Sequence, residues 1–79
     1  MEAVRDRVIG IMAEVLKVST DVLQDDVAIG DIPEWDSLHH IQLVSAIEKA
    51  FDFRFTPDVM MDLEDVEDIV NAVELRVNQ

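Results

Sequence analysis

The sequence contains no cysteine, and this absence removes several kinds of site. Without cysteine the chain cannot form a disulfide, bind zinc through thiolates or use a thiol as a nucleophile. Any thiol chemistry must therefore come from a group that is added to the protein.

Basic residues and long apolar runs are also scarce. Six lysine and arginine residues stand against eighteen aspartate and glutamate residues, for a formal net charge of −12. This charge repels nucleic-acid phosphates and anionic membrane surfaces, although surplus acid could equally serve solubility alone. No apolar run approaches a membrane span, and no secretory signal is visible. We therefore expect a soluble, cytoplasmic protein with basic protein partners and no nucleic-acid or membrane partner.

The length of 79 residues fits one domain, spanning 1–79, with little room for a deep catalytic cleft. Met1 lies directly before the first predicted helix and Gln79 directly after the last. We therefore expect a discrete chain, which we also expect to be a monomer.

A first helix is predicted near the N-terminus, where apolar residues recur at helical spacing. These residues are Val4, Val8, Ile11, Met12, Val15 and Leu16, with Glu2, Arg5, Asp6 and Glu14 largely on the other side. From Leu16 to Trp35 turn-forming residues predict a long loop. Thr20 could cap a single helical turn there. Six apolar residues are expected to anchor the loop to the core: Val18, Val22, Leu23, Val27, Ile29 and Ile32.

Three further helices follow from caps and apolar spacing. Asp36 is placed to cap a second helix, whose expected apolar stripe is Leu38, Ile41, Val44 or Leu43, Ile47 and Phe51. Residues 51–55 alternate like a strand but have no partner strand, so we expect an extended connector. Thr56 and Pro57 predict the start of a short third helix. Asp65 precedes the apolar face of a last helix, namely Val66, Ile69, Val70, Val73 and Val77.

The predicted fold class is therefore all-α: a small four-helix bundle of three longer helices and one short helix, with a long first loop. The long first loop leaves the direction of the second helix relative to the first open.

The stretch Glu34-Trp35-Asp36-Ser37-Leu38 places a hydroxyl group at the boundary between a loop and a helix. A side chain at that position is exposed, and the unpaired N–H groups and dipole of the helix start favour an anion there. A phosphodiester on Ser37 would fit this position. Alternatively, Ser37 is an ordinary first-turn serine.

The run Trp35-Asp36-Ser37-Leu38, followed at helical spacing by apolar residues, Glu48 and Phe51, resembles the phosphopantetheine-attachment segment of the acyl carrier protein family. The resemblance extends over essentially the whole chain and includes the order of its helices. It implies that the chain is a carrier and not an enzyme. It also implies that a phosphopantetheinyl transferase joins 4′-phosphopantetheine from coenzyme A to Ser37, and that the arm's thiol then holds acyl or peptidyl groups as thioesters.

The resemblance also implies partners and recognition residues. The expected partners are an acyl-activating ligase or acyltransferase, and condensing and tailoring enzymes with basic docking patches, in fatty-acid, polyketide or related biosynthesis. Asp36 would position the modifying enzyme, and Leu38 would dock in an apolar contact. The second helix as a whole would be the recognition surface, with Trp35, His39, Gln42 and Glu48 as further recognition residues.

The chain departs from carriers of housekeeping fatty-acid synthesis directly after the Ser-Leu pair. Those carriers have acids there, whereas this chain has His39, His40 and Gln42. We interpret the departure as a sign of a specialised pathway with its own partner enzymes, the alternative being drift on a solvated face. The histidines could also modulate docking by titrating near neutral pH.

Three chemical alternatives are weaker. Adjacent histidines on a helix point about 100° apart and no third ligand follows, so we expect no metal site. Ser37, His40 and Asp36 are the residue types of a hydrolytic triad, but a small bundle offers no substrate cleft. The acids around Asp25 and Asp31 suggest calcium binding, but apolar residues occupy alternate ligand positions.

Two further alternatives stay open from the sequence. Trp35 is either an aromatic residue that contacts partners or the arm, or a plug that seals the loop onto the bundle. The chain could also be a protein-interaction domain of carrier fold that is never loaded.

Overall fold

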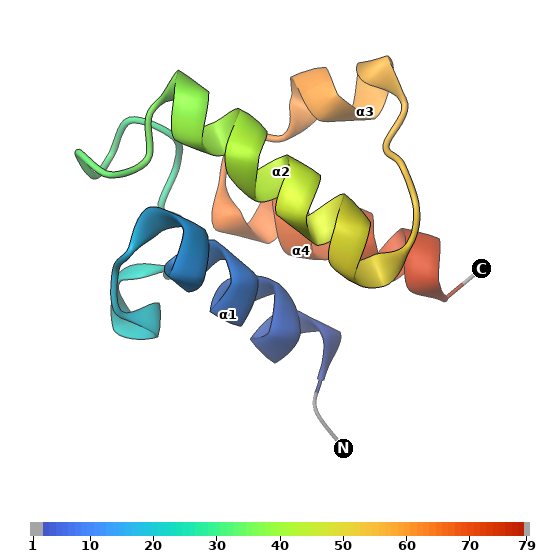
Figure 1. Ribbon diagram of the computed structural model, residues 1–79, viewed down its shortest axis with the longest axis horizontal. Helices are drawn as coiled ribbons and strands as arrows, with labels where there is room; N and C mark the ends of the chain where they lie inside the picture. Colours follow the sequence, from blue (N-terminus) through green and yellow to red (C-terminus); the bar gives the residue numbers. More distant parts are fainter. Residues whose placement is uncertain (1–2, 79) are drawn as a thin grey trace.

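The computed structural model describes residues 3–78. In this range the chain forms α1 (Val4–Leu16), the 3-10 turn η1 (Thr20–Val22), α2 (Ser37–Phe51), α3 (Pro57–Asp62) and α4 (Val66–Val77). Figure 1 shows these helices gathered into one small bundle, which confirms the predicted fold class. Met1, Glu2 and Gln79, which also enter the predictions from the sequence, lie outside the described residues.

The structure settles the direction of α2, which runs antiparallel to α1 (Figure 1). Arg7, in the first half of α1, donates a hydrogen bond from Nη2 to the carbonyl oxygen of Ala50 at 3.0 Å. Its guanidinium carbon also lies 4.5 Å from the centroid of the Phe51 ring. The start of α1 is therefore held against the end of α2, and α1 packs on α4 as well.

The core consists entirely of apolar side chains, and no polar or charged residue of the described range is buried. Its members come from α1, α2, α4 and the connecting segments: Val8, Met12, Ala13, Leu16, Leu23, Trp35, Leu43, Val44, Ile47, Phe55, Leu63, Val66, Ile69, Val70 and Val73. The short helix α3 contributes no buried residue. Within residues 3–78 no helix has the length and apolar character needed to cross a membrane.

The long loop between α1 and α2 is fixed to the start of α4 by its backbone. The N–H of Ile29 donates to the carbonyl oxygen of Glu64 at 2.9 Å, and the N–H of Val66 donates to that of Val27 at 3.0 Å. An isolated bridge pairs the intervening residues Ala28 and Asp65. These bonds order a segment that has almost no helix of its own.

The predicted loop anchors are mostly confirmed. Leu23 is buried, and Val18, Val27, Ile29 and Ile32 are partly buried against the core. Val22 is 38% exposed, so its prediction as an anchor is wrong. The prediction of Thr20 as a cap is also wrong, because the hydroxyl of Ser19 accepts the N–H of Asp21 at 3.3 Å and Thr20 is the first residue of η1.

The apolar stripe predicted for α2 is only partly confirmed. Leu43, Val44 and Ile47 are buried, but Leu38 and Ile41 are 61% and 62% exposed. The inward side of the first turn is instead taken by His40, which is partly buried and contacts the buried Trp35. In α4 the predicted face is buried except at its end, where Val77 is 37% exposed.

The connector predicted over residues 51–55 is only partly confirmed, because Phe51 ends α2 and Asp52 has a left-handed φ angle of 58°. Residues 53–55 are neither helix nor strand, and polar contacts hold them in place. A carboxylate oxygen of Glu48 accepts the N–H of Phe55 at 2.7 Å. Arg76 donates from Nη1 to the carbonyl oxygen of Arg54 at 3.0 Å and lies over the ring of Phe53. The hydroxyl of Thr56 then accepts the N–H of Val59 at 3.4 Å and caps α3, which confirms the predicted start of that helix.

Candidate functional site

Ser37 is the first residue of α2, and its side chain is exposed. Asp36 before it has extended backbone angles, and its Oδ1 atom accepts the N–H of His39 at 2.9 Å. This is the predicted helix cap, since the capping oxygen satisfies one of the N–H groups that a helix start leaves unpaired. A hydroxyl group is thus presented at the start of a 15-residue helix.

The start of α2 also offers free hydrogen-bond donors. Within residues 3–78 the N–H groups of Ser37 and Leu38 have no backbone or side-chain acceptor. These N–H groups and the positive end of the helix dipole favour a negatively charged group on the serine oxygen. The site therefore fits a phosphodiester, both in its exposure and in its electrostatics.

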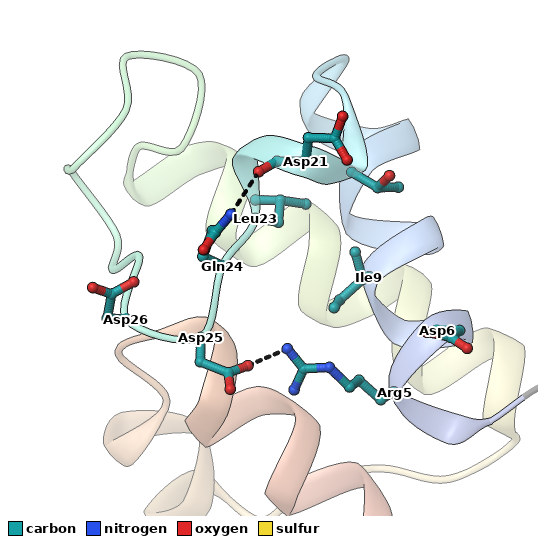
Figure 2. Close-up of a pocket in the computed structure, with 9 residues that line it drawn as sticks. Arg5, Asp6, Ile9, Asp21, Leu23, Gln24, Asp25 and Asp26 are labelled. Carbon is teal, nitrogen blue, oxygen red and sulfur yellow. Dashed lines mark hydrogen bonds and ion pairs between the residues drawn. The ribbon is translucent and has the colours of Figure 1, made fainter.

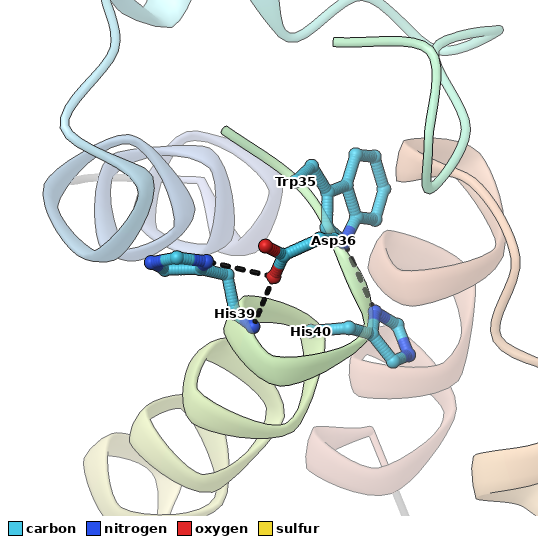
Figure 3. Close-up of polar contacts among 4 residues, drawn as sticks. All are labelled: Trp35, Asp36, His39 and His40. Carbon is cyan, nitrogen blue, oxygen red and sulfur yellow. Dashed lines mark hydrogen bonds and ion pairs between the residues drawn. The ribbon is translucent and has the colours of Figure 1, made fainter. Parts of the chain in front are cut away.

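His39 binds the same oxygen of Asp36 through its ring as well as through its backbone. Its Nδ1 atom lies 2.7 Å from Oδ1, so the ring donates a hydrogen bond when Nδ1 carries a proton (Figure 3). The backbone hydrogen bond, and next the ring hydrogen bond, lower the pKa of the Asp36 carboxyl below its usual value. Asp36 therefore stays ionised at neutral pH, and its second oxygen is not used in either bond.

Trp35 points the other way, into the bundle. Its side chain is fully buried, and its Nε1–H donates to Nδ1 of His40 at 3.1 Å. The structure thus supports the plug interpretation of Trp35. The prediction that Trp35 contacts partners is corrected here, because a partner cannot reach an indole that has no exposed surface.

The two histidines make separate contacts, which bears on the hydrolytic alternative. Asp36 orients His39, whereas Nδ1 of His40 accepts from Trp35 (Figure 3). Asp36 therefore does not orient His40, as a triad made of Asp36, His40 and Ser37 would require. Among the described residues no group of three or more histidine, cysteine, aspartate or glutamate side chains is arranged to hold a metal ion.

The remaining predicted recognition residues lie along α2. Leu38 and Gln42 are exposed, and Ile41 adds a second exposed apolar side chain one turn after Leu38. Glu48 is only partly exposed, and its carboxylate is engaged by the N–H of Phe55. The structure thus gives Glu48 a role in holding the connector.

A surface hollow of about 540 Å³ lies between the start of α1 and the loop after η1 (Figure 2). Its lining residues are Arg5, Asp6, Ile9, Thr20, Asp21, Leu23, Gln24, Asp25 and Asp26, none of which belongs to α2. Asp25 forms an ion pair with Arg5. Farther along the loop, Asp31 accepts the N–H of Ala28 at 2.8 Å. Two acids of the calcium-binding alternative are thus used in contacts within the chain.

Sequence reasoning missed the role of His40. A buried tryptophan normally needs an acceptor for its N–H group, and His40 lies five residues after Trp35. The plug interpretation of Trp35 therefore implies a nearby acceptor, whereas the apolar spacing alone predicts a stripe through Leu38 and Ile41.

Comparison with protein families and with curated proteins gives one clear result. No curated protein matches the sequence significantly. Residues 6–73, most of the chain, match the family model described as a phosphopantetheine attachment site. Domains of this family are the sites of covalent 4′-phosphopantetheine attachment, and they interact with phosphopantetheinyl transferases and biosynthetic enzymes. Together with the helical bundle and the exposed serine at the start of α2, this match shows that the chain belongs to the phosphopantetheine-binding acyl carrier family.

Proposed function

We propose that Ser37 is the residue that holds the phosphopantetheine arm, and that residues 1–79 act as a single, non-catalytic carrier domain. The observation that supports this most directly is the exposed hydroxyl at the first position of α2, next to two N–H groups that have no acceptor within the described range 3–78. When bound, the arm supplies the thiol that the sequence lacks and on which acyl or peptidyl groups are held.

The other serines of the chain are less suited to this role. The hydroxyl of Ser19 caps the short turn η1, and Ser45 lies in the middle of α2, where the backbone N–H groups are already paired. Only Ser37 combines exposure with the start of a long helix. In the attachment reaction its oxygen would form a bond to phosphorus of coenzyme A while the bond to the nucleotide part breaks and the hydroxyl proton is released.

We also propose that the first half of α2 is the surface that partner enzymes recognise. Leu38 and Ile41 are large apolar side chains that remain more than half exposed and lie one turn apart beside Ser37. Met61 and Leu75 are also more than half exposed, but they lie on α3 and α4. Asp36, His39 and Gln42 are polar neighbours of Leu38 and Ile41 in the sequence, and all three are at least partly exposed. With a net charge of −12, the chain suits a transferase, a ligase or acyltransferase, and condensing or tailoring enzymes whose docking patches are basic.

The pathway that we propose is a specialised one with dedicated partners. His39, His40 and Gln42 replace the acids expected after the Ser-Leu pair of housekeeping carriers. His39 is partly used to hold Asp36, and His40 is used to hold Trp35. Efficient complementation of a strain lacking its housekeeping fatty-acid carrier would contradict this part of the proposal.

The attachment proposal is tested by intact-mass measurement after incubation with coenzyme A and broad-specificity transferases. The expected result is one phosphopantetheinyl group on the wild type and on Ser45→Ala, and none on Ser37→Ala. A wild-type chain that stays unmodified with several transferases would favour the alternative of an interaction domain that is never loaded.

A further inference from the structure

The contact between Trp35 and His40 joins the long loop to the first turn of α2. The indole Nε1–H donates to Nδ1 of His40 at 3.1 Å, and the two rings stack with centroids 6.0 Å apart and planes inclined by 26° (Figure 3). Because Trp35 is fully buried, its N–H group cannot bond to water and needs an acceptor within the protein. His40 supplies that acceptor.

Trp35 in turn fixes the backbone that leads into the serine. Its carbonyl oxygen accepts the N–H of Gly30 at 2.8 Å, and its own N–H donates to the carbonyl oxygen of Ile32 at 3.1 Å. The next residue is the cap Asp36, and the one after it is Ser37. A displacement of the indole would therefore move the peptide units that place both the cap and the hydroxyl.

We propose that His40 is a positioning residue for the modification of Ser37. By accepting the N–H of Trp35, it holds the start of α2 in the conformation that a phosphopantetheinyl transferase binds. This inference rests on the proposed function of Ser37. His40 acts through Trp35 and need not contact the serine hydroxyl or coenzyme A.

The protonation of His40 agrees with this role. Only a ring without a proton on Nδ1 can accept a hydrogen bond there. Burial lowers the pKa of His40, which favours the neutral ring at neutral pH. The neutral ring is therefore the form that holds Trp35.

Two substitutions at His40 distinguish the effect of the hydrogen-bond acceptor from the effect of side-chain size. The Nδ1 atom is bonded to Cγ, as the side-chain oxygen of asparagine is, so His40→Asn keeps an acceptor near the same place. His40→Leu keeps a side chain of similar size but removes the acceptor, leaving the indole N–H buried and unpaired. Ser45→Leu is the matched control, because it places leucine at an exposed position of the same helix.

The experiment measures loading and the environment of Trp35 together. Loading is followed as kcat/KM of a broad-specificity transferase with coenzyme A, by intact mass. Trp35 is the only tryptophan, so its fluorescence emission reports directly on the plug. Circular dichroism at the assay temperature verifies that each variant is folded.

The expected result is a loss of about fivefold or more in kcat/KM for His40→Leu, with His40→Asn within about twofold of the wild type. The emission of His40→Leu should shift to longer wavelength, and that of His40→Asn should not. Ser45→Leu should match the wild type in both measurements.

Other outcomes identify which claim fails. Unchanged loading in folded His40→Leu would overturn the positioning role but not the attachment at Ser37. Slower loading without a change in emission would also overturn it, because His40 would then contact the transferase directly. A wild type that cannot be loaded would overturn the proposed function and the positioning role with it.

A second pair of variants covers the case in which His40→Leu does not fold. Trp35→Phe removes the indole N–H but keeps an aromatic side chain in the core. In the Trp35→Phe background, adding His40→Asn should leave kcat/KM for loading unchanged. Adding His40→Leu should cause no further loss of kcat/KM either. A further loss of similar size in the Trp35→Phe background would contradict an action through Trp35.

Discussion

The Oδ1 atom of Asp36 accepts the backbone N–H of His39 at 2.9 Å and lies 2.7 Å from the Nδ1 atom of the same residue. One carboxylate oxygen thus caps α2 and holds an imidazole, while the charge stays beside Ser37. Asp65 gives α4 the same kind of cap, with its Oδ1 atom 2.8 Å from the N–H of Asp68. The two caps differ in that only Asp36 adjoins the candidate attachment residue.

This difference gives a paired prediction for the two caps. Asp65→Ala should cost about 1 kcal/mol of unfolding free energy, as a lost helix cap does, and leave loading of the folded protein unchanged. Asp36→Ala should lower the urea midpoint too, and should in addition reduce kcat/KM for loading by about tenfold or more, because a charged partner of the transferase is lost. Equal loading of the two variants would show that Asp36 serves only as a cap.

The stability of the protein should depend on the protonation of His40. Because burial lowers the pKa of His40 below its usual value of 6.5, the unfolded chain binds the proton more readily than the folded one. The neutral ring of His40 therefore contributes its full share of the free energy of unfolding above pH 6.5. This contribution is lost as the pH falls from there through the lower pKa of the folded state. Between pH 7 and about pH 5, the melting temperature of the wild type should therefore fall further than that of His40→Asn. Parallel curves for the two proteins would contradict this assignment.

The two glycines should respond in opposite directions to substitution by alanine. Gly30 has a φ angle of 90°, in the region that L side chains avoid, so Gly30→Ala should cost about 1 kcal/mol. Gly10 lies exposed within α1, and a Cβ atom there would meet nothing within 4 Å. Gly10→Ala should therefore stabilise the protein by about 0.5–1 kcal/mol. Urea unfolding measures both, and destabilisation by Gly10→Ala would contradict the packing described here.

Arg7 should stabilise the antiparallel pair of α1 and α2. It donates to the carbonyl oxygen of Ala50 and lies over the ring of Phe51. Arg7→Ala should cost about 0.5–1 kcal/mol, the range of an exposed cation–π contact. Arg7→Lys should lose part of this amount, because a lysine keeps the charge but not the planar group. Unfolding in low salt and in high salt would test both, and no loss in Arg7→Ala would contradict the contact.

The sequence predicted the elements of this fold well because their starts are marked locally. Asp36, Thr56 and Asp65 cap the helices that follow them, as their side-chain chemistry indicates. The strand-like run at 51–55 has no second strand to pair with, and residues 53–55 accordingly form no strand, although Phe51 extends α2. These features depend on neighbours in the sequence.

The inward faces of the elements were harder to predict, because they depend on packing between distant segments. Leu38 and Ile41 fit a helical stripe but are exposed, since α2 turns His40 toward the buried Trp35. The direction of α2 relative to α1 depends on contacts between residues that are far apart in the chain, such as the hydrogen bond from Arg7 to Ala50. The pattern around Ser37 could be read from adjacent residues, whereas the support of Trp35 by His40 required the fold.

The central claim is that the arm is attached at Ser37, and peptide mapping tests it most directly. The chain has five hydroxyl residues, Ser19, Thr20, Ser37, Ser45 and Thr56. After transferase treatment, tandem mass spectrometry should find the phosphopantetheinyl group on the peptide that contains Ser37, with fragment ions assigning it to that residue. A group located on any of the other four hydroxyl residues, or full loading of Ser37→Ala, would contradict the account.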